Sequence, residues 1–116
     1  MKRIQGHLLG IDHGLVNLFS DFATDGEMWT GEGTRERRQR VSFSEPFKEP
    51  PVVQVALSLW DMDAGTNVRA DIGAEDVDET GFNIVFRTWG DTRVARVRMS
   101  WTALGEVRGD DDWDVD

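Results

Sequence analysis

The sequence of 116 residues contains no cysteine. Disulfide bonds, thiolate catalysis and cysteine-based zinc sites are therefore excluded. It also lacks a long hydrophobic run, and no segment approaches the roughly 20 apolar residues of a membrane-spanning helix. The segment from Met1 to Ile11 is short and interrupted by polar residues, so we expect neither a signal peptide nor membrane insertion. The chain is expected to be cytoplasmic, or to reach a surface by a non-classical route.

Basic residues are scarce as well. Lys and Arg number 13 against 22 Asp and Glu, which gives a formal net charge of −9 and a pI of about 4.6. Nucleic acid is therefore not an expected partner, because binding it requires a basic footprint. The hydrophobic fraction of 39%, with five Trp and six Phe, is enough to pack a core in one domain.

Apolar and polar residues alternate along much of the chain from its middle onward. The alternating runs are 41–44, 53–60, 68–74, 82–89 and 95–103. Turn-forming residues separate them, and the double proline Pro50-Pro51 lies just before a run, where a missing backbone donor does least damage. No segment has a sustained helical period. The pattern predicts an all-β sandwich or barrel.

The first third of the chain is less regular. Residues 15–22 are apolar enough for a strand, with residues 4–11 as its candidate partner. Residues 24–40 are polar and glycine-rich, and are predicted to form a long loop. We expect residues 1–108 to form one domain and residues 109–116 to be a disordered acidic tail, because like charges repel.

No catalytic constellation stands out, so the chain is not expected to be an enzyme. His7 and His13 have no partners at metal-ligand or triad spacing, and no serine lies in a nucleophile-elbow motif. Carboxylates are too numerous for any pair to be diagnostic. The segment 61–67 resembles a calcium loop without its terminal glutamate, and a hairpin turn explains the same residues. No cofactor is expected; calcium, at this loop or the acidic tail, is the one ion considered.

The placement of the arginines is unusual for so acidic a chain. Four of them share the outward phase of their predicted strands: Arg69, Arg87, Arg96 and Arg98. Such residues pair with carboxylates, as Arg69 or Arg96 would with Asp71, or they lie at an interface or bind ligand hydroxyls. Trp60, Val85 and Trp89 are also predicted to point outward. They are too apolar for an open sheet surface, which indicates a subunit interface or a ligand platform.

A series of short stretches, in a specific order and spacing, spans most of the chain. They are Thr34-Arg35-Glu36, Val41-Ser42-Phe43, Pro46-Phe47, Pro50-Pro51-Val52-Val53, Leu59-Trp60-Asp61, Asn67-Val68-Arg69, Thr80-Gly81-Phe82, Thr88-Trp89-Gly90-Asp91-Thr92 and Ser100-Trp101-Thr102-Ala103. In these stretches the chain resembles the H-type lectin domain of snail agglutinins and discoidin C-terminal domains. The resemblance implies a six-stranded antiparallel β-sandwich, assembled as a trimer, with sugar sites near neighbouring protomers and a frequent preference for N-acetylgalactosamine.

The resemblance also implies a carbohydrate-binding site. Arg69 lies where the family has a sugar-binding arginine, and Trp89, Gly90 and Asp91 lie in its tryptophan-containing binding loop. Thr30, Gly31 and Glu32 lie near the loop position where snail lectins use glycine and aspartate, and Gly31 and Glu32 are the site residues expected there. In this site Arg69 would bind two hydroxyls, Glu32 would accept hydrogen bonds from the sugar, and Trp89 would form an apolar wall.

Two departures from the family pattern affect the expected ligand. Gly90 stands where the best-known snail lectin has a sugar-contacting histidine, and Ala95 stands where it has an aromatic residue. The expected function is a lectin for N-acetylgalactosamine or galactose-type glycans, multivalent through trimerisation and suited to cell adhesion. The alternative is a trimeric structural or interaction module of a surface or phage-like assembly. In that case there is no sugar site, and Arg69 and Trp89 serve the subunit interface.

Overall fold

The computed structural model describes residues 1–109 as an elongated sandwich of 58 × 29 × 19 Å. Within these residues it contains one short helix, α1 (Glu27–Thr30), and six strands. The strands are β1 (Leu9–Ser20), β2 (Arg35–Ser42), β3 (Val52–Met62), β4 (Asp71–Glu75), β5 (Gly81–Thr88) and β6 (Val94–Glu106). The predicted acidic tail, apart from Gly109, lies outside the described residues.

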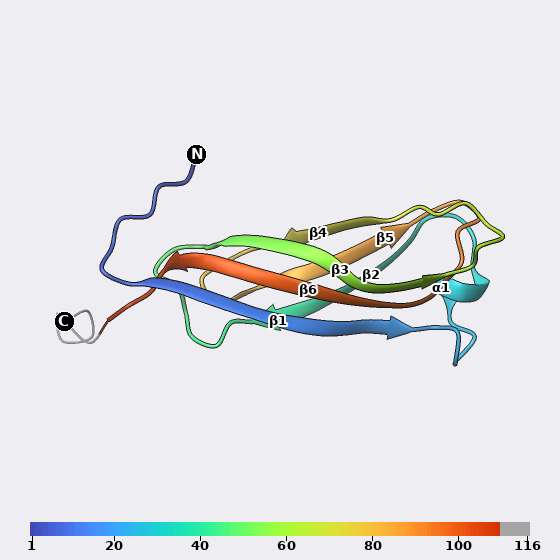
Figure 1. Ribbon diagram of the computed structural model, residues 1–116, viewed down its shortest axis with the longest axis horizontal. Coiled ribbons are helices and arrows are strands. Elements are labelled where there is room, and N and C mark those ends of the chain that lie inside the picture. The colour runs from blue at the N-terminus through green and yellow to red at the C-terminus, as the bar shows by residue number, and fades with distance from the viewer. Residues whose placement is uncertain (110–116) are drawn as a thin grey trace.

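The strands form two antiparallel sheets that pack face to face (Figure 1). One sheet has the order β1-β6-β3 and the other has the order β2-β5-β4, so β6 and β5 are the central strands. This arrangement confirms the predicted six-stranded antiparallel sandwich.

The core lies between the two central strands. On β6 the inward residues Val97, Met99 and Trp101 are buried, and on β5 Phe82 and Phe86 are fully buried. The Phe82 and Trp101 rings meet edge to face with 5.5 Å between centroids. Burial of each large apolar side chain stabilises the fold by about 1.5–3 kcal/mol. The alternation predicted for these two strands is therefore confirmed.

The first third of the chain differs from its prediction. Residues 4–11 and 15–22 do not pair with each other, because β1 is one continuous strand whose partner is β6, with Leu9 opposite Glu106. The predicted loop over residues 24–40 contains α1 and most of β2. β2 was missed because the alternating apolar pattern is absent from Arg35 to Arg40.

The strand predicted to begin at Val68 also starts later. β4 begins at Asp71, and Val68 is 62% exposed. Two threonine hydroxyls take the place of ladder bonds here: Thr92 Oγ1 donates to the Asn67 carbonyl at 2.5 Å, and Thr88 Oγ1 donates to the Arg69 carbonyl at 2.7 Å. Residues 67–70 are thus fixed by side chains rather than by a neighbouring strand.

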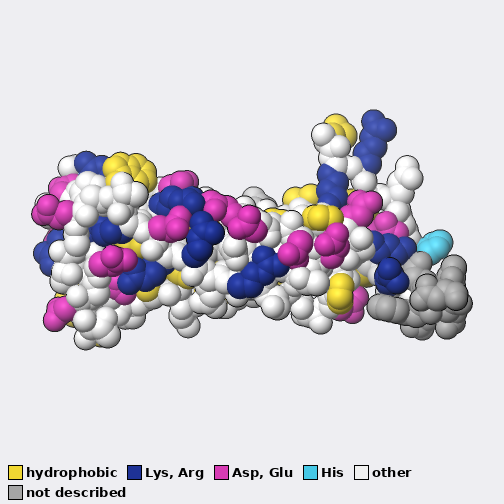
Figure 2. All heavy atoms as spheres, turned by 180° about the vertical axis from the view of Figure 1, so that it is seen from behind, with side chains coloured by type: hydrophobic (Ala, Val, Ile, Leu, Met, Phe, Trp, Pro, Cys, Tyr) yellow, Lys and Arg dark blue, Asp and Glu magenta, His cyan; other side chains and the backbone are white. Residues whose placement is uncertain are grey.

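The outward residues of β2, β5 and β4 form what we call the charged face (Figure 2). Four of these residues close a ring of ion pairs, in which Arg38 and Arg87 each contact both Glu36 and Glu75 at 2.7–3.2 Å. To reach Glu75, Arg38 crosses β5 beside its register partner Val85, which is fully buried. The prediction that Val85 is an apolar spot on an open surface is therefore wrong.

On the other sheet, the outward residues between Glu106 at one end and Arg98 and Arg96 toward the other form a different surface, the neutral face. It consists of three rows across the sheet, namely Ile11–Leu104–Val52, His13–Thr102–Gln54 and Leu15–Ser100–Ala56. None of the nine residues is Asp, Glu, Lys or Arg. Ile11 and Leu15 are 61% and 64% exposed, and Val52 is 44% exposed. This face leaves apolar side chains in contact with solvent.

The antiparallel topology gives the sandwich two distinct ends. We call one end the tip: it contains α1 and the three connections 21–34, 63–70 and 89–93. The opposite end, the base, contains the connections 43–51 and 76–80 and the start of β1 and end of β6 (Figure 1). Within residues 1–109, no helix has the length and apolar character required to cross a bilayer.

Candidate functional site

Helix α1 closes the core at the tip. Its Met28 side chain is fully buried, and its Met28 amide donates to the buried Asp21 carboxylate at 2.9 Å. Arg37 from β2 donates to the same Asp21 oxygen at 2.9 Å and to Glu27 at 2.9 Å. These contacts fix the loop that carries Gly31 and Glu32 against the end of the sandwich.

Arg69 lies at the tip just before β4, and its side chain is about one-third exposed. Its Nη1 donates to Asp91 Oδ1 at 2.5 Å and to Thr92 Oγ1 at 3.4 Å. The hydrogen bond from Arg69 lowers the pKa of Asp91, which keeps this carboxylate ionised. Within residues 1–109, the Arg69 Nε and Nη2 atoms have no hydrogen-bond partner, so three of the five N–H donors of the fork remain available.

The arginine pairings differ from those predicted with Asp71. Arg69 pairs with Asp91, and Arg96 contacts Asp61 at 3.3 Å. Asp71 lies opposite Arg87 in the sheet register. Arg69 lies in the connection before β4 rather than on a strand, so strand periodicity was not a valid guide to its partner.

Gly90 is required by the conformation of the loop. Its φ is +67°, and a Cβ atom at this position would lie 2.8 Å from Arg69 Nη1. The positive φ favours glycine, and a side chain here would displace the arginine from Asp91. The absence of histidine at this position is therefore coupled to the way Arg69 is held. Ala95, the second departure, is 5% exposed and lies within the fold rather than in the site.

The loop after α1 meets the Gly90 loop directly. Gly33, with φ of +78°, donates from its amide to the Gly90 carbonyl at 2.9 Å. Gly31 ends α1 by donating to the Glu27 carbonyl at 2.7 Å, and the exposed Glu32 lies between the two glycines. The structure thus gathers the sequence-predicted residues at the tip. They are Gly31, Glu32, Arg69, Trp89, Gly90 and Asp91.

Aromatic residues are exposed around this end. Trp89 is 44% exposed and Trp60 is 59% exposed. The bulge between Leu57 and Leu59 places Trp60 opposite the buried Val97, so Trp60 is exposed at the end of its strand and does not lie on the outward phase that was expected. Phe22 contacts Trp29 edge to face at 5.1 Å, and the Arg93 guanidinium lies over the Trp29 ring at 4.2 Å. This second cluster was not predicted, because the aromatic residues lie in a stretch without periodicity.

Sequence reasoning also missed Arg35 and Thr92. Arg35 is buried and donates to carbonyls of two of the tip connections, 21–34 and 89–93. Thr92 is fully buried and contacts Arg69. No signal in the sequence distinguished Arg35 from the other arginines that follow it up to Arg40.

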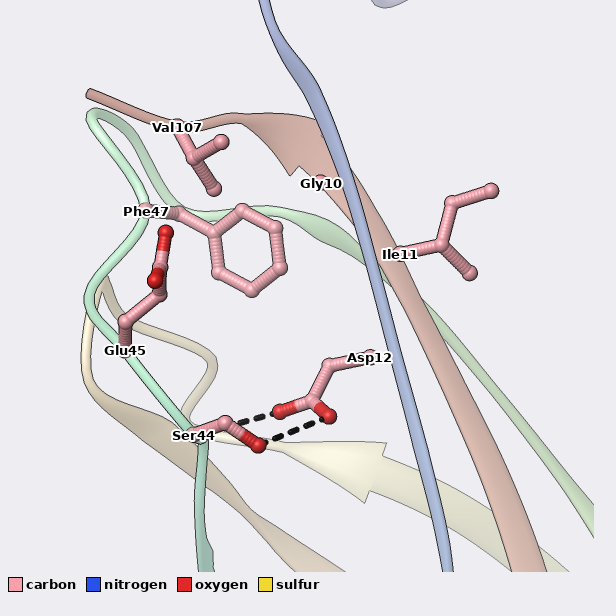
Figure 3. Close-up of a pocket in the computed structure, with 7 residues that line it drawn as sticks. All are labelled: Gly10, Ile11, Asp12, Ser44, Glu45, Phe47 and Val107. Carbon is pink, nitrogen blue, oxygen red and sulfur yellow. Dashed lines mark hydrogen bonds between the residues drawn. The ribbon is translucent and has the colours of Figure 1, made fainter. Parts of the chain in front are cut away.

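A cavity of about 250 Å³ lies at the opposite end, between β1 and the connection that follows β2 (Figure 3). Asp12 accepts hydrogen bonds there from the Ser44 amide at 2.7 Å and the Ser44 hydroxyl at 3.0 Å. The ring of Phe47, 4% exposed, lines the cavity. The Asp12–Ser44 contact ties the edge strand to this connection, so its carboxylate already has a structural role.

The described part of the chain contains no group of three or more His, Cys, Asp or Glu side chains arranged to hold a metal ion. In the segment considered for calcium, Asp63 forms a turn by accepting from the Gly65 amide at 2.8 Å. Asp63 also accepts from Arg93 at 3.3 Å. These contacts correspond to the hairpin-turn interpretation.

Comparisons with known proteins agree with this fold. The model of the family described as H-type lectin domain matches residues 38–104. The protein "ATP synthase subunits region ORF 7" of Fuscovulum blasticum is 57% identical over 111 residues, which is 96% of each chain.

Two structures of discoidin II from Dictyostelium discoideum, the native recombinant form and the wild-type form, superpose with TM-scores of 0.73 and 0.74. Both are 21% identical, with 84% and 85% of this chain covered. The chain spans 37% of the length of these discoidin chains. With the family match over residues 38–104 and the shared β-sandwich, the chain belongs to the H-type lectin domain family.

Proposed function

We propose that this protein is a lectin that binds N-acetylgalactosamine or galactose-type glycans at its tip. The observation that carries the proposal is the state of Arg69, which is held by Asp91 through one nitrogen while its Nε and Nη2 donors remain available. The exposed Trp89 belongs to the same loop as Asp91. Membership of the H-type lectin domain family supports the same function.

The chemistry of these side chains suits a sugar. A guanidinium is a planar fork that can donate to two neighbouring hydroxyl oxygens at once. The carboxylate of Glu32 can accept hydrogen bonds from other hydroxyls, and the Trp89 ring offers an apolar surface to the C–H face of a sugar ring. Because Asp91 orients the arginine before the ligand arrives, little freedom is lost on binding.

Substitution of Arg69 tests the site. We expect both Arg69→Ala and Arg69→Lys to abolish glycan binding, since hydrogen bonds to charged groups are worth about 1.5–3 kcal/mol each and an ammonium cannot reproduce the fork. The measurement is a glycan array followed by titration with N-acetylgalactosamine and galactose. Arg40→Ala is the matched control, because Arg40 pairs with Asp78 at 2.7 Å on the charged face and away from the tip.

The outcome also decides between the two functions. Unchanged glycan binding by an intact Arg69→Ala protein would show that the site lies elsewhere. If Arg69→Ala instead dissociates or unfolds, and the wild-type protein binds no glycan on the array, the structural or interaction module is favoured. The existing Arg69–Asp91 contact is the observation on the side of that alternative, because it needs no ligand.

We propose further that the protein assembles as a homotrimer, and that the neutral face is the assembly surface. Two observations support this choice. The charged face closes its own ion pairs and covers Val85, whereas the neutral face exposes Ile11, Leu15 and Val52. In a chain with a net charge of −9, it also offers a surface on which copies meet without carboxylates.

Assembly would compensate for a shallow site. Several weak sites on one particle bind a glycan-covered surface far more tightly than one site does, because later contacts are intramolecular. Light scattering at micromolar concentration tests the assembly itself. We expect the mass of a trimer, and a stable monomer would refute this part of the proposal while leaving the glycan site intact.

A further inference from the structure

We infer that Arg35 is a positioning residue that holds the two loops of the glycan site in register, an inference that rests on the function proposed above. Arg35 is the first residue of β2 and is only 5% exposed. A buried charge is costly unless its hydrogen-bonding groups are satisfied. Among residues 1–109, every hydrogen bond of this guanidinium goes to a backbone carbonyl and none goes to a carboxylate.

The five bonds divide between two segments that are distant in sequence. In the loop around α1, Nε donates to Gly33 at 2.9 Å, and Nη1 donates to Glu27 at 3.3 Å and Met28 at 3.2 Å. In the β5–β6 connection, Nη2 donates to Gly90 at 3.2 Å and Thr92 at 2.7 Å. The number of bonds equals the number of N–H groups on an arginine, so the whole fork is used.

These carbonyls belong to the segments that carry the proposed site. The Gly90 carbonyl accepts from both Arg35 Nη2 and the Gly33 amide, which makes it the point where the two loops meet. Gly90 packs directly against the Arg69 guanidinium. The next two residues, Asp91 and Thr92, accept hydrogen bonds from Arg69 Nη1. Arg35 therefore acts on the ligand through Arg69 and does not touch the ligand itself.

No other side chain type can take over this arrangement. Lysine presents three donors from a single point and glutamine presents two, so neither can reach the carbonyls of both segments as the five N–H groups of the planar fork do. Unpaired buried carbonyls favour conformations in which the loop opens toward water. We expect the 89–92 segment to become mobile and Arg69 to lose its fixed orientation, while the aromatic core between β5 and β6 stays packed.

The test combines binding with local hydrogen exchange on Arg35→Lys and Arg35→Gln. Titrated with N-acetylgalactosamine and galactose, both variants should bind at least about tenfold more weakly than wild type, which corresponds to about 1.4 kcal/mol. Amide exchange should rise in residues 27–33 and 89–92 and stay unchanged in the buried residues of β5 and β6.

Arg40→Gln is the matched control. Arg40 lies on the same strand, but among the described residues it bonds to Asp76 and Asp78 at the base, away from both loops of the glycan site. We expect it to keep wild-type binding and a protected 89–92 segment.

Three results would overturn the inference. They are wild-type affinity in Arg35→Lys and Arg35→Gln, an equal rise of exchange throughout the core, and failure of both variants to fold, since the last two mean that Arg35 supports the whole fold. If the wild-type protein itself binds neither sugar, the proposed function fails. The exchange pattern then still decides whether Arg35 orders the two loops.

Discussion

The charged face and the neutral face are each built on three strands, yet they deal with the solvent in opposite ways. On the charged face, Arg38 and Arg87 each contact two glutamates, and the side chains together cover Val85, the one outward apolar residue of the central strand. On the neutral face, small polar and apolar side chains leave Ile11 and Leu15 largely exposed. A surface whose groups already satisfy one another has little to gain from a partner, whereas the neutral face gains by losing water.

The largest effect is expected from a charge placed under the ion-pair ring. Val85→Asp would put a carboxylate at a fully buried position, where it competes with Glu36 and Glu75 for Arg38, and should lower the free energy of unfolding by about 3 kcal/mol or more. Val85→Thr, which nearly conserves volume, should cost about 1–3 kcal/mol and keep the protein measurable. Urea denaturation gives both values. An unchanged midpoint in Val85→Thr would mean that the ring does not seal this position.

A charge on the opposite face should act on assembly rather than on folding. Ile11→Asp would bring carboxylates together in the trimer and remove exposed apolar area, so the dissociation constant should rise by more than about tenfold. The unfolding midpoint of the isolated chain should change little. Light scattering across a dilution series measures the effect, with Val68→Asp at the tip as the control, since Val68 is 62% exposed and lies outside the neutral face. Equal dissociation by both variants would place the interface elsewhere.

Acid should produce the smallest effect and should act on the charged side of the molecule. Hydrogen bonds from the Thr80 hydroxyl and amide lower the pKa of Asp78 from 3.8 to about 2. A carboxylate whose pKa is lowered by folding contributes stability that is fully present above pH 3.8 and is lost as the pH falls toward 2. The pKa values of Glu36 and Glu75 are lowered in the same direction, mainly by hydrogen bonds from Arg38 and Arg87 respectively.

The measurement is the melting temperature as a function of pH. It should decline below about pH 4, and the decline should be smaller in Asp78→Asn, which cannot be protonated at this side chain. A melting temperature that stays constant from pH 5 to pH 2 would contradict the assigned ion pairs.

The same two sheets show why part of the fold could be predicted from sequence. In β5 and β6 the inward positions are apolar, so alternation alone identified both strands and their inward residues, though not the burial of the outward Val85. In β2 the inward positions include Arg35 and Arg37, and no inward residue before Val41 is apolar, so the strand shows no apolar–polar alternation. At residues 67–70 the threonine side chains of another segment replace a strand partner, which no local pattern can indicate.

The candidate site divides in the same way. Arg69 and Trp89 were found through the resemblance of short stretches, and the structure places both at the tip with Gly31, Glu32, Gly90 and Asp91. Arg35 was not found, because its partner Gly90 lies 55 residues away and a buried arginine looks like an exposed one in sequence. The resemblance therefore indicated the residues of the proposed glycan site, whereas the buried residue that supports them is recognisable only in the folded structure.

The tip and the base lie at opposite ends of the sandwich, and this determines how the protein can be attached to a support. β1 starts and β6 ends at the base, so residues 1–8 and 107–109 leave the sandwich at the end far from α1 (Figure 1). A support attached through either segment would hold the domain at its base and leave the tip exposed at the far end of the 58 Å long axis. In the proposed trimer, three domains side by side would direct all three tips toward the same surface.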